Sequence, residues 1–355
     1  MLRIQSNSPP IWGSKIRPLD VSALSALVSK LSRRSSQLST IDIAGHMHAI
    51  YPAISPLLSQ MDHVSHLKLK NRHIGNKLFH FKSLADHING SLPCPELRTL
   101  ILVDICIPWT FSIFHSKLTH LCLEYSSGEF DCAPHYPLQL NTLQDILECS
   151  PQLEGLSVKN CPLRLDVAPD AHPPRFTSLL HLKELTIVDY NSQPPTIIEL
   201  LSRMIFPKGT TILLELASDE HGVSDDVLDE LHSLLLGCSS IKPCFVDLHA
   251  LALTVDDEGI WVRGWTEALP ACCMADSRQL LDPLITARIV GRAFVEQEEE
   301  EAIGLLARMA NMFRSDQIKV LYLHNRKGPP KIPPNAVPRF RRKSRPHRRP
   351  KISVF

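Results

Sequence analysis

No hydrophobic run in this sequence is long enough to cross a membrane. A membrane-spanning helix needs about 18 or more consecutive apolar residues, and no such stretch is present. The chain also opens without the charged and then apolar segment of a secretory signal peptide. These absences predict a soluble protein of the cytoplasm or nucleus that has no membrane partner.

The short motifs that catalytic and cofactor sites require are missing as well. The sequence contains no G-x-x-x-x-G-K-[ST] loop for phosphates and no G-x-G-x-x-G segment after a strand. It also has no G-x-S-x-G turn and no H-E-x-x-H pair. We therefore expect a protein that is not an enzyme and uses no cofactor.

The ten cysteines form no C-x-x-C motif. Cys106, Cys122 and Cys161 lie in or just after apolar segments, where a free cysteine behaves as a small hydrophobic residue. The pattern predicts reduced and buried thiols, as is usual in the cytosol and nucleus. Cys272 and Cys273 are adjacent and are the candidates for another role, although packing is the interpretation we favour.

Histidines are frequent, but they form only one tight pair, His46 and His48. A structural zinc site takes four ligands, and the nearest further candidates are His63 and His66. We interpret these histidines as surface or turn residues and expect no metal site.

Acidic residues are absent after Asp316. This last part of the chain holds 12 of the 38 Lys and Arg residues, which leaves 26 basic and 37 acidic residues before it. Seven prolines after His324 exclude regular structure, so residues 326–355 are predicted to form a disordered tail. The basic cluster of this tail consists of Arg339, Arg341, Arg342, Lys343, Arg345, Arg348 and Arg349.

The basic tail has several interpretations. A run of Lys and Arg can be bound by a nuclear import receptor, or it can hold nucleic-acid phosphates without sequence preference. Phe340 is the one aromatic residue in the cluster, so base stacking is not expected there. The remaining alternative is a solvated extension with no partner.

What the sequence does contain is a recurring L-x-x-L-x-L spacing. Its clearest copy is QLEGLSVKNC at residues 152–161, where Leu153, Leu156 and Val158 carry the spacing. Asn160 and Cys161 follow at the position of the Asn/Cys turn of a leucine-rich repeat. Apolar residues at a period of two indicate a strand with one buried face, and such a unit needs stacked neighbours to cover that face.

Copies of this spacing occur along most of the chain. They lie at residues 38–43, 64–69, 97–102, 118–123, 153–158, 182–187, 211–216, 248–253, 284–289 and 318–323. The first six copies begin 21 to 35 residues apart, which is irregular for standard repeats. We predict an α/β fold over residues 38–325: an irregular leucine-rich-repeat solenoid of about ten degenerate repeats. Its parallel sheet would be curved, with helices and loops on the convex side.

Helices are predicted between some of these strands and before the first one. The helical pattern covers residues 142–149, 196–205, 224–236 and 296–313. In the last helix, the acidic run 298–301 is interpreted as a solvated face, and Leu305, Leu306, Met309 and Met312 as core rather than as a groove for a partner. Residues 1–37 are predicted to form a turn-rich segment and a capping helix near residues 20–31.

The strand residues between the buried positions are the candidate binding residues. Stacked strands create an extended concave surface, and solenoids usually bind proteins there. The candidates for protein binding on this face are His66, Lys68, Lys70, His120, Glu124, Ser157, Lys159, Glu184, Thr186, Glu215, Tyr322 and His324. Lysines are more frequent early in this series and glutamates in its middle, which favours a partner of complementary charge.

The order of these motifs resembles a known family. PPIWGSKI at residues 9–16 is similar to the passage that follows the F-box in fungal F-box proteins of the basidiomycete group. The segments QLSTIDI, HVSHLKL, ELRTLIL, KLTHLCL, QLEGLSV and HLKELTI resemble the leucine-rich repeats of the same proteins. The resemblance covers residues 9–325.

This resemblance implies the substrate-recognition region of a ubiquitin-ligase receptor. In that family, the F-box docks on a Skp-type adaptor and the repeats hold the substrate. The F-box would lie before Trp12, where this chain has only eleven residues. We therefore expect a Skp-type adaptor as partner only if an F-box lies upstream. The expected function is a noncatalytic protein-binding scaffold, and the alternative is a nuclear or nucleic-acid-associated protein that acts through its basic tail.

Overall fold

The computed structural model describes part of the chain, in two compact units. The described residues are 2–5, 26, 38–45, 62–71, 79–80, 94–106, 109, 112–115, 117–125, 138–161, 163–164, 175–189, 194–217, 232–233, 235, 248–255, 259–267, 283–290, 304, 306–310, 318, 320–325 and 351–354. Unit 1 is Met1–Glu184 and unit 2 is Leu185–Phe355. Both consist mostly of parallel β-sheet with few helices among the described residues.

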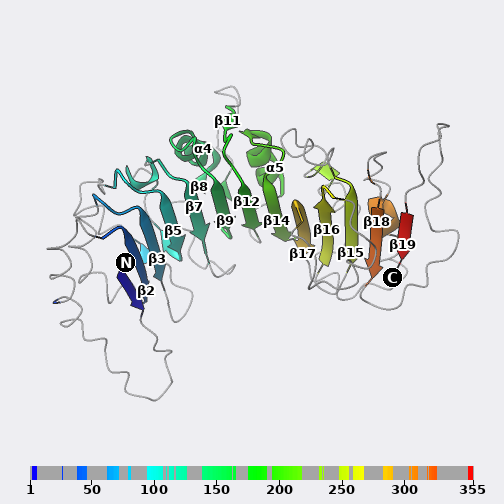
Figure 1. The fold of residues 1–355 in the computed structure, drawn as a ribbon, viewed down its shortest axis with the longest axis horizontal. Coiled ribbons are helices and arrows are strands. Elements are labelled where there is room, and N and C mark those ends of the chain that lie inside the picture. Colours follow the sequence, from blue (N-terminus) through cyan, green and yellow to red (C-terminus); the bar gives the residue numbers. More distant parts are fainter. Residues whose placement is uncertain are drawn as a thin grey trace, which may run out of the picture. The chain divides into compact units, whose positions relative to one another are not determined.

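The sheet of unit 1 is parallel, and its strands pair in the order in which they occur along the chain (Figure 1). They are β1 (Leu2–Gln5), β2 (Thr40–Gly45), β3 (His66–Asn71), β5 (Thr99–Val103), β7 (His120–Glu124) and β9 (Gly155–Lys159). The boundary between the units falls within β12 (Glu184–Asp189). Two short parallel pairs accompany the sheet: β4 (Phe79–His80) with β6 (Ile105–Cys106), and β8 (Leu138–Gln139) with β10 (Leu163–Arg164).

In unit 1 the leucine spacing produces the same local structure each time: the first apolar residue of a copy lies two positions before the strand, and all three apolar residues are buried. In one copy, Leu118, Leu121 and Leu123 are at most 2% exposed. In the next copy, Leu153 is fully buried. These buried side chains pack the strands on one face and leave the alternate residues on the other. In unit 2 the pattern is less regular, since Thr211 is exposed and Leu284 is only half-buried.

A repeated backbone contact holds successive strands of unit 1 in register. The residue just before each strand has a carbonyl oxygen that accepts two hydrogen bonds. The donors are two consecutive N–H groups at the start of the next strand. For example, the Arg98 oxygen accepts from Thr119 at 2.7 Å and from His120 at 3.0 Å. The same double contact is made by the carbonyl oxygens of Ser39, Ser65, Thr119 and Glu154. The recurrence explains why strands separated by returns of different length still align residue by residue.

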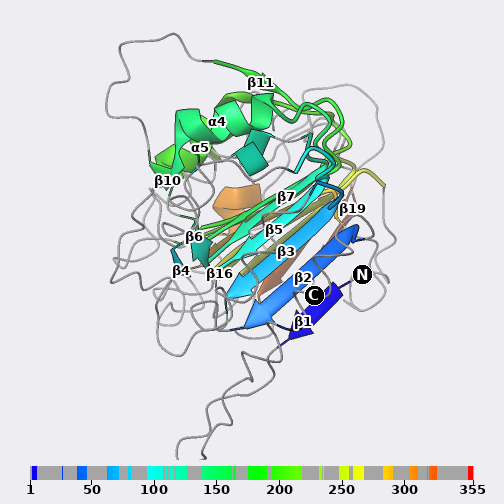
Figure 2. The ribbon, with the colours of Figure 1, turned by 90° about the vertical axis from the view of Figure 1, so that its left-hand side faces the viewer.

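The core of unit 1 lies between the sheet and the returning segments. Helix α4 (Leu140–Glu148) buries Leu140, Leu143, Ile146 and Leu147. Figure 2 shows α4 to one side of the adjacent strands β2, β3, β5 and β7. The 3-10 helix η2 (Ser112–His115) contributes Phe114, which is fully buried, and its ring centroid lies 5.2 Å from that of Trp109.

The sheet of unit 2 departs from the predicted stacking. Its strand order is β14 (Thr211–Ala217), β17 (Ile285–Val290), β16 (Gly259–Trp265), β15 (Ala250–Val255), β18 (Val320–Asn325) and β19 (Lys351–Val354). Strand β16 is antiparallel to both of its neighbours, whereas the other pairs are parallel. The predicted parallel sheet is therefore interrupted in this unit by one antiparallel strand.

Strand β16 was not predicted, and its direction follows from the sequence between β15 and β16. Only three residues, 256–258, separate the two strands. A parallel pair needs a crossover of a dozen or more residues, so a connection this short permits only an antiparallel hairpin. Strands β17 and β16 then lie between β14 and β15.

The ten predicted strands all coincide with strands of the structure: β2, β3, β5, β7, β9, β12, β14, β15, β17 and β18. The predicted helix at 142–149 is α4, and that at 196–205 is α5 (Pro194–Ser202), although its last two residues form the short strand β13 (Met204–Ile205). These assignments confirm the α/β class and the parallel sheet.

The remaining predicted helices are described only in part. Ala26, His232, Gly304 and residues 306–310 are helical. Leu306 and Met309 are buried, which confirms their assignment to the core, whereas Leu305, Met312 and the acidic run 298–301 lie outside the described residues.

Both ends of the chain contribute strands that the sequence analysis did not predict. Leu2–Gln5 forms β1 beside β2, within the segment expected to be turn-rich. Lys351–Val354 forms β19 beside β18, so the prediction of a disordered tail is corrected at these residues. Residues 326–350, with Arg339 to Arg349, lie outside the described part of the chain. No helix in the described ranges is both long and apolar enough to span a membrane.

Candidate functional site

The sheet face opposite the core of unit 1 carries the candidate site. Along β3 and β7, buried and more exposed residues alternate, so His66, Lys68 and Lys70 share one side of the sheet. We define the outer face of unit 1 as the residues on this side of β2, β3, β5, β7 and β9: Thr40, Asp42, Ala44, His66, Lys68, Lys70, Thr99, Ile101, Val103, His120, Cys122, Glu124, Gly155, Ser157 and Lys159.

The strand register places these residues in three straight rows. The first row is Thr40, His66, Thr99, His120 and Gly155. The second is Asp42, Lys68, Ile101, Cys122 and Ser157. The third is Ala44, Lys70, Val103, Glu124 and Lys159. Neighbours within a row are about 4.8 Å apart, so side chains from five different segments share one side of the sheet. Of these residues, Asp42, Ala44, Val103 and Gly155 are buried.

Seven of the predicted binding residues are brought together on this surface. They are His66, Lys68, Lys70, His120, Glu124, Ser157 and Lys159. Glu184 is exposed at the start of β12, at the end of unit 1, whereas Thr186 and Glu215 belong to unit 2. Tyr322 and His324 lie on β18, and their side chains are outside the described part of the structure.

Several outer-face residues were missed by the sequence analysis. Thr99, Ile101 and Val103 alternate with the buried Leu100 and Leu102, so the same period of two would have identified them. Cys122 was assigned to the buried thiols, but it lies on the outer face between Ile101 and Ser157 and is only half-buried. Cys161 is buried as predicted, and Cys272 and Cys273 are outside the described residues.

One close approach shapes the first row. A Cβ atom added to Gly155 would lie 2.8 Å from Cδ2 of His120, so the imidazole ring covers the glycine. Nδ1 of the same ring lies 3.1 Å from the hydroxyl of Thr119. The absence of a side chain at Gly155 thus provides the space in which the exposed His120 ring lies.

Electrostatic contacts on the outer face are local. The Nζ of Lys159 lies 3.6 Å from a carboxylate oxygen of Glu124, an exposed pair that contributes roughly 0–1 kcal/mol. Burial lowers the pKa of His66 below its usual 6.5, and Lys68 and His120 act in the same direction, whereas Asp42 opposes the shift. Burial also raises the pKa of the Cys122 thiol, although a hydrogen bond with Ser157 opposes this. Cys122 is therefore a neutral thiol rather than a nucleophilic thiolate.

The side of the unit 2 sheet opposite its buried residues contains a compact aromatic and charged cluster. Arg288 Nη1 donates to Glu215 Oε1 at 2.6 Å, and both side chains are at most 16% exposed. The guanidinium of Arg288 lies 4.2 Å from the ring centroid of Trp261, and that of Arg263 lies 4.9 Å from it. Glu215 was predicted, but its partners were not, because β16 was missed and β17 matched the spacing weakly.

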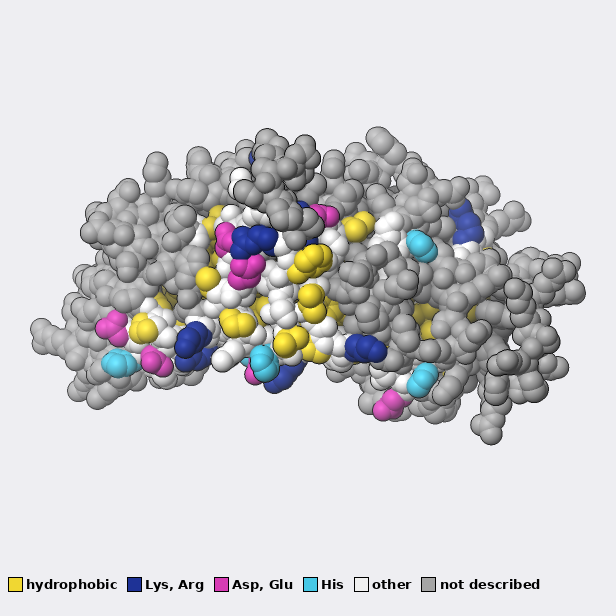
Figure 3. Space-filling view, turned by 90° about the horizontal axis from the view of Figure 1, so that it is seen from above, with side chains coloured by type: hydrophobic (Ala, Val, Ile, Leu, Met, Phe, Trp, Pro, Cys, Tyr) yellow, Lys and Arg dark blue, Asp and Glu magenta, His cyan; other side chains and the backbone are white. Residues whose placement is uncertain are grey.

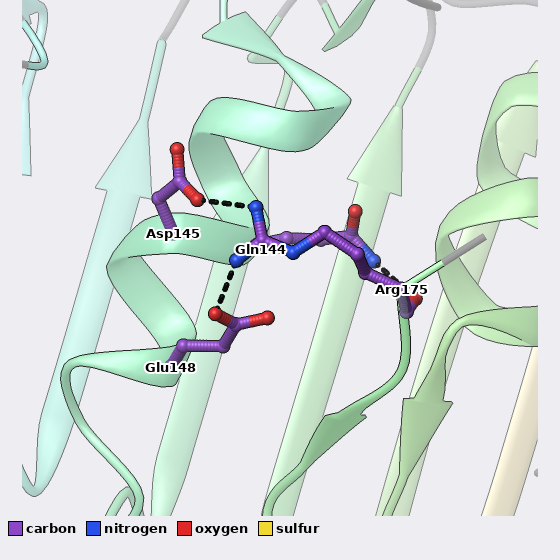
Figure 4. A network of polar contacts seen from close by, with 4 residues as sticks. All are labelled: Gln144, Asp145, Glu148 and Arg175. Carbon is purple, nitrogen blue, oxygen red and sulfur yellow. Dashed lines mark hydrogen bonds and ion pairs between the residues drawn. The ribbon is translucent and has the colours of Figure 1, made fainter. Parts of the chain in front are cut away.

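A second polar network lies on the helical side of unit 1 (Figure 4). The fully buried Gln144 donates from Nε2 to the carbonyl oxygen of Arg175 at 2.9 Å. The Arg175 guanidinium binds Asp145 at 2.8 Å and also Glu148, and these hydrogen bonds raise its pKa. Because each contact joins α4 to the segment before β11 (Thr177–Ser178), we interpret the network as structural.

Apolar side chains are exposed next to this network. Phe176 and Leu180 are 60% and 66% exposed and flank β11. In Figure 3, which views the molecule from above, apolar side chains lie beside a group of acidic and basic ones.

The described residues contain no group of three His, Cys, Asp or Glu side chains placed to hold a metal ion. Of the histidines considered for zinc, His63 and His66 are described, whereas His46 and His48 lie outside the described residues. The chain matches no protein-family model, and no curated protein or solved structure shows significant similarity to it.

Proposed function

We propose that this protein is a noncatalytic scaffold that binds another protein on the outer face of unit 1. The supporting observation is the three rows of side chains, which come from strands aligned by a repeated backbone contact. A surface held by main-chain hydrogen bonds changes little on binding, so it loses little conformational entropy in the complex. Together with the resemblance to F-box leucine-rich-repeat proteins, this favours substrate recognition for a ubiquitin ligase.

Arginine substitutions within the rows test the binding face. Ser157→Arg and Thr99→Arg each place a long charged side chain on the outer face without replacing a core residue. Ser178→Arg is the matched control, because Ser178 is exposed on β11 beside α4. Tagged full-length chains would be used to capture proteins from an extract of the natural source, and the captured proteins quantified by mass spectrometry.

The expected result is a set of proteins captured by the wild-type and Ser178→Arg chains and lost with both outer-face variants. Circular dichroism must show that all chains are folded. Capture of the same proteins at the same levels by Ser157→Arg and Thr99→Arg would exclude the outer face as the binding site.

The ligase role additionally requires an F-box. We propose that a Skp-type adaptor binds only a chain in which an F-box helix pair precedes Trp12. Copurification of the adaptor with such an extended chain, and its absence with residues 1–355, is the expected result. Failure of the extended chain to bind the adaptor would remove the ligase role and leave the scaffold role intact.

The alternative function rests on the basic tail, whose cluster between Arg339 and Lys351 contains no acidic residue. A tail of this composition would bind nucleic acid through phosphates, with an affinity that falls steeply as salt rises. Binding of the full chain to a DNA duplex at about 50 mM and 200 mM salt tests it. Absent or salt-insensitive binding would exclude the nucleic-acid function.

A further inference from the structure

The charges on the outer face of unit 1 are separated by strand. All three outer residues of β3 are basic or can become so: His66, Lys68 and Lys70. The adjacent strand β5 contributes Thr99, Ile101 and the buried Val103, none of which is ionisable. A basic strand therefore borders an uncharged one.

The acidic groups of this face offset only part of the charge of the β3 lysines. Asp42 is the register neighbour of Lys68 but is only 9% exposed, so little of its carboxylate is available to a partner. Glu124 lies beside Lys159 at 3.6 Å, two strands away from β3. The half-exposed Lys68 and Lys70 thus give the β3 side of the outer face an excess of positive charge.

An apolar area lies next to these lysines in the second row. Ile101 and Cys122 are adjacent in the register and both are partly exposed. Lys68 is beside Ile101, and Ser157 is beside Cys122. An apolar centre between polar neighbours is the arrangement in which a single partner side chain can be desolvated and held.

We propose that the outer face of unit 1 binds an acidic peptide segment of a protein partner, with an acidic residue on Lys68 and Lys70 and an apolar residue on Ile101 and Cys122. The inference rests on the proposed scaffold function and adds the chemistry of the partner. The ligand is a polypeptide, because the charged and apolar subsites match alternate side chains of an extended chain.

The spacing of the two subsites defines the peptide pattern. Strands are about 4.8 Å apart, so the midpoint between Ile101 and Cys122 lies about 7 Å from Lys68 along the row. Alternate side chains of an extended peptide are separated by about 6.8 Å. The matching pattern is therefore acidic-x-apolar, with the peptide running across the strands.

The test uses fluorescein-labelled peptides and the full chain. The probe consists of repeated Asp-Ser-Leu triplets, and the two comparison peptides replace Asp by Lys or Leu by Ser. Fluorescence anisotropy at low salt should show binding of the Asp-Ser-Leu peptide, with at least about tenfold weaker binding of both comparison peptides.

Variants of the chain locate the site. Lys68→Glu and Lys70→Glu should each weaken binding of the Asp-Ser-Leu peptide about tenfold, because attraction becomes repulsion. Lys208→Glu, an exposed lysine of unit 2 with the same charge change, should leave the affinity unchanged. Lys68→Gln, which loses the charge without reversing it, should give an intermediate affinity, and Ile101→Ser should weaken binding while preserving the preference for Asp over Lys.

Three results would overturn the proposal: no binding of the Asp-Ser-Leu peptide to the wild-type chain, equal binding of the Lys-Ser-Leu peptide, or an affinity unchanged by Lys68→Glu. Each would leave the scaffold function standing if Ser157→Arg still abolishes partner capture. Conversely, retained partner capture by Ser157→Arg would remove the scaffold function, whatever the peptide result.

Discussion

Asn160 Nδ2 donates a hydrogen bond to the carbonyl oxygen of Tyr125 at 3.1 Å. The two residues directly follow β9 and β7, and the Tyr125 N–H in turn donates to the carbonyl oxygen of Lys159 at 2.9 Å. Asn160 also has a positive φ of 51°, a conformation that asparagine tolerates better than most residues. The Asn turn predicted from QLEGLSVKNC thus closes one strand and joins it to the preceding one.

Substitutions at Asn160 should separate the stability that its side-chain hydrogen bond contributes from the stability that its tolerance of a positive φ contributes. Asn160→Gly keeps the backbone conformation and loses the hydrogen bond, so it should cost about 1 kcal/mol of unfolding free energy. Asn160→Ala loses both and should cost about 2–3 kcal/mol. Urea unfolding followed by circular dichroism measures both values. Equal costs for the two variants would show that the backbone conformation contributes nothing.

Gly264 should not tolerate a side chain. A Cβ atom there would overlap Cδ1 of Leu248 and lie 3.1 Å from its Cδ2, and Leu248 is fully buried. Gly264→Ala should therefore destabilise the protein by about 1–3 kcal/mol, whereas Gly209→Ala, with nothing within 4 Å of the added atom, serves as the control. Thermal unfolding measures the difference. Restoration of stability by an additional Leu248→Val change would identify the overlap as the cause.

Removal of the Glu215 carboxylate should lower the free energy of unfolding. Glu215 and Arg288 are 16% and 15% exposed, so little water can replace the lost partner. Glu215→Gln should cost about 1–3 kcal/mol. The matched control is Glu199→Gln, which breaks the more exposed pair between Glu199 of α5 and Arg203, the residue after this helix, and should cost less than about 0.5 kcal/mol. A similar loss for both variants in urea unfolding would contradict the role assigned to burial.

The described cysteines should differ in reactivity. Cys149 is exposed, whereas Cys94 is buried and its pKa is raised to about 12 by burial and by the charge of Asp62. Iodoacetamide at about pH 8 should therefore modify Cys149 first, Cys122 more slowly, and Cys94 and Cys161 last, because the thiolate is the reactive form. Peptide mapping by mass spectrometry gives the order. In urea the differences should disappear, and a native chain that reacts fastest at Cys94 would contradict the structure.

His66 should make stability depend on pH in a defined direction. Its pKa is lowered in the folded protein, chiefly by burial, and Lys68 and His120 add to this while Asp42 opposes it. Between the lowered pKa and the ordinary value of 6.5, the unfolded chain binds more protons than the folded one. Stability should therefore fall as the pH drops below 6.5.

Replacement of His66 provides the check on that prediction. His66→Gln should lose this part of the decline, whereas His63→Gln, at an exposed position, should retain it. Melting temperatures between about pH 5 and pH 8 measure the difference. A wild-type chain that becomes more stable on acidification through this range, while His66→Gln does not, would reverse the assigned direction.

The sequence by itself determined where ten of the strands lie and, for most of them, which residues are buried. Each L-x-x-L-x-L copy specifies a strand and its inward side, since side chains alternate at a period of two wherever the segment is placed. His66, Lys68 and Ser157 could be assigned to an outer face for this reason. That information is local and needs no knowledge of neighbouring strands.

Only the tertiary structure decided which of these residues are neighbours. Periodicity within a segment does not encode the register between segments, so the row that joins Lys68, Ile101 and Cys122 was not predictable from it. The same reason applies to Trp261, which reaches Arg288 because an antiparallel hairpin enters the sheet of unit 2. Strand pairing is set by long-range hydrogen bonds and packing, and these exist only in the folded chain.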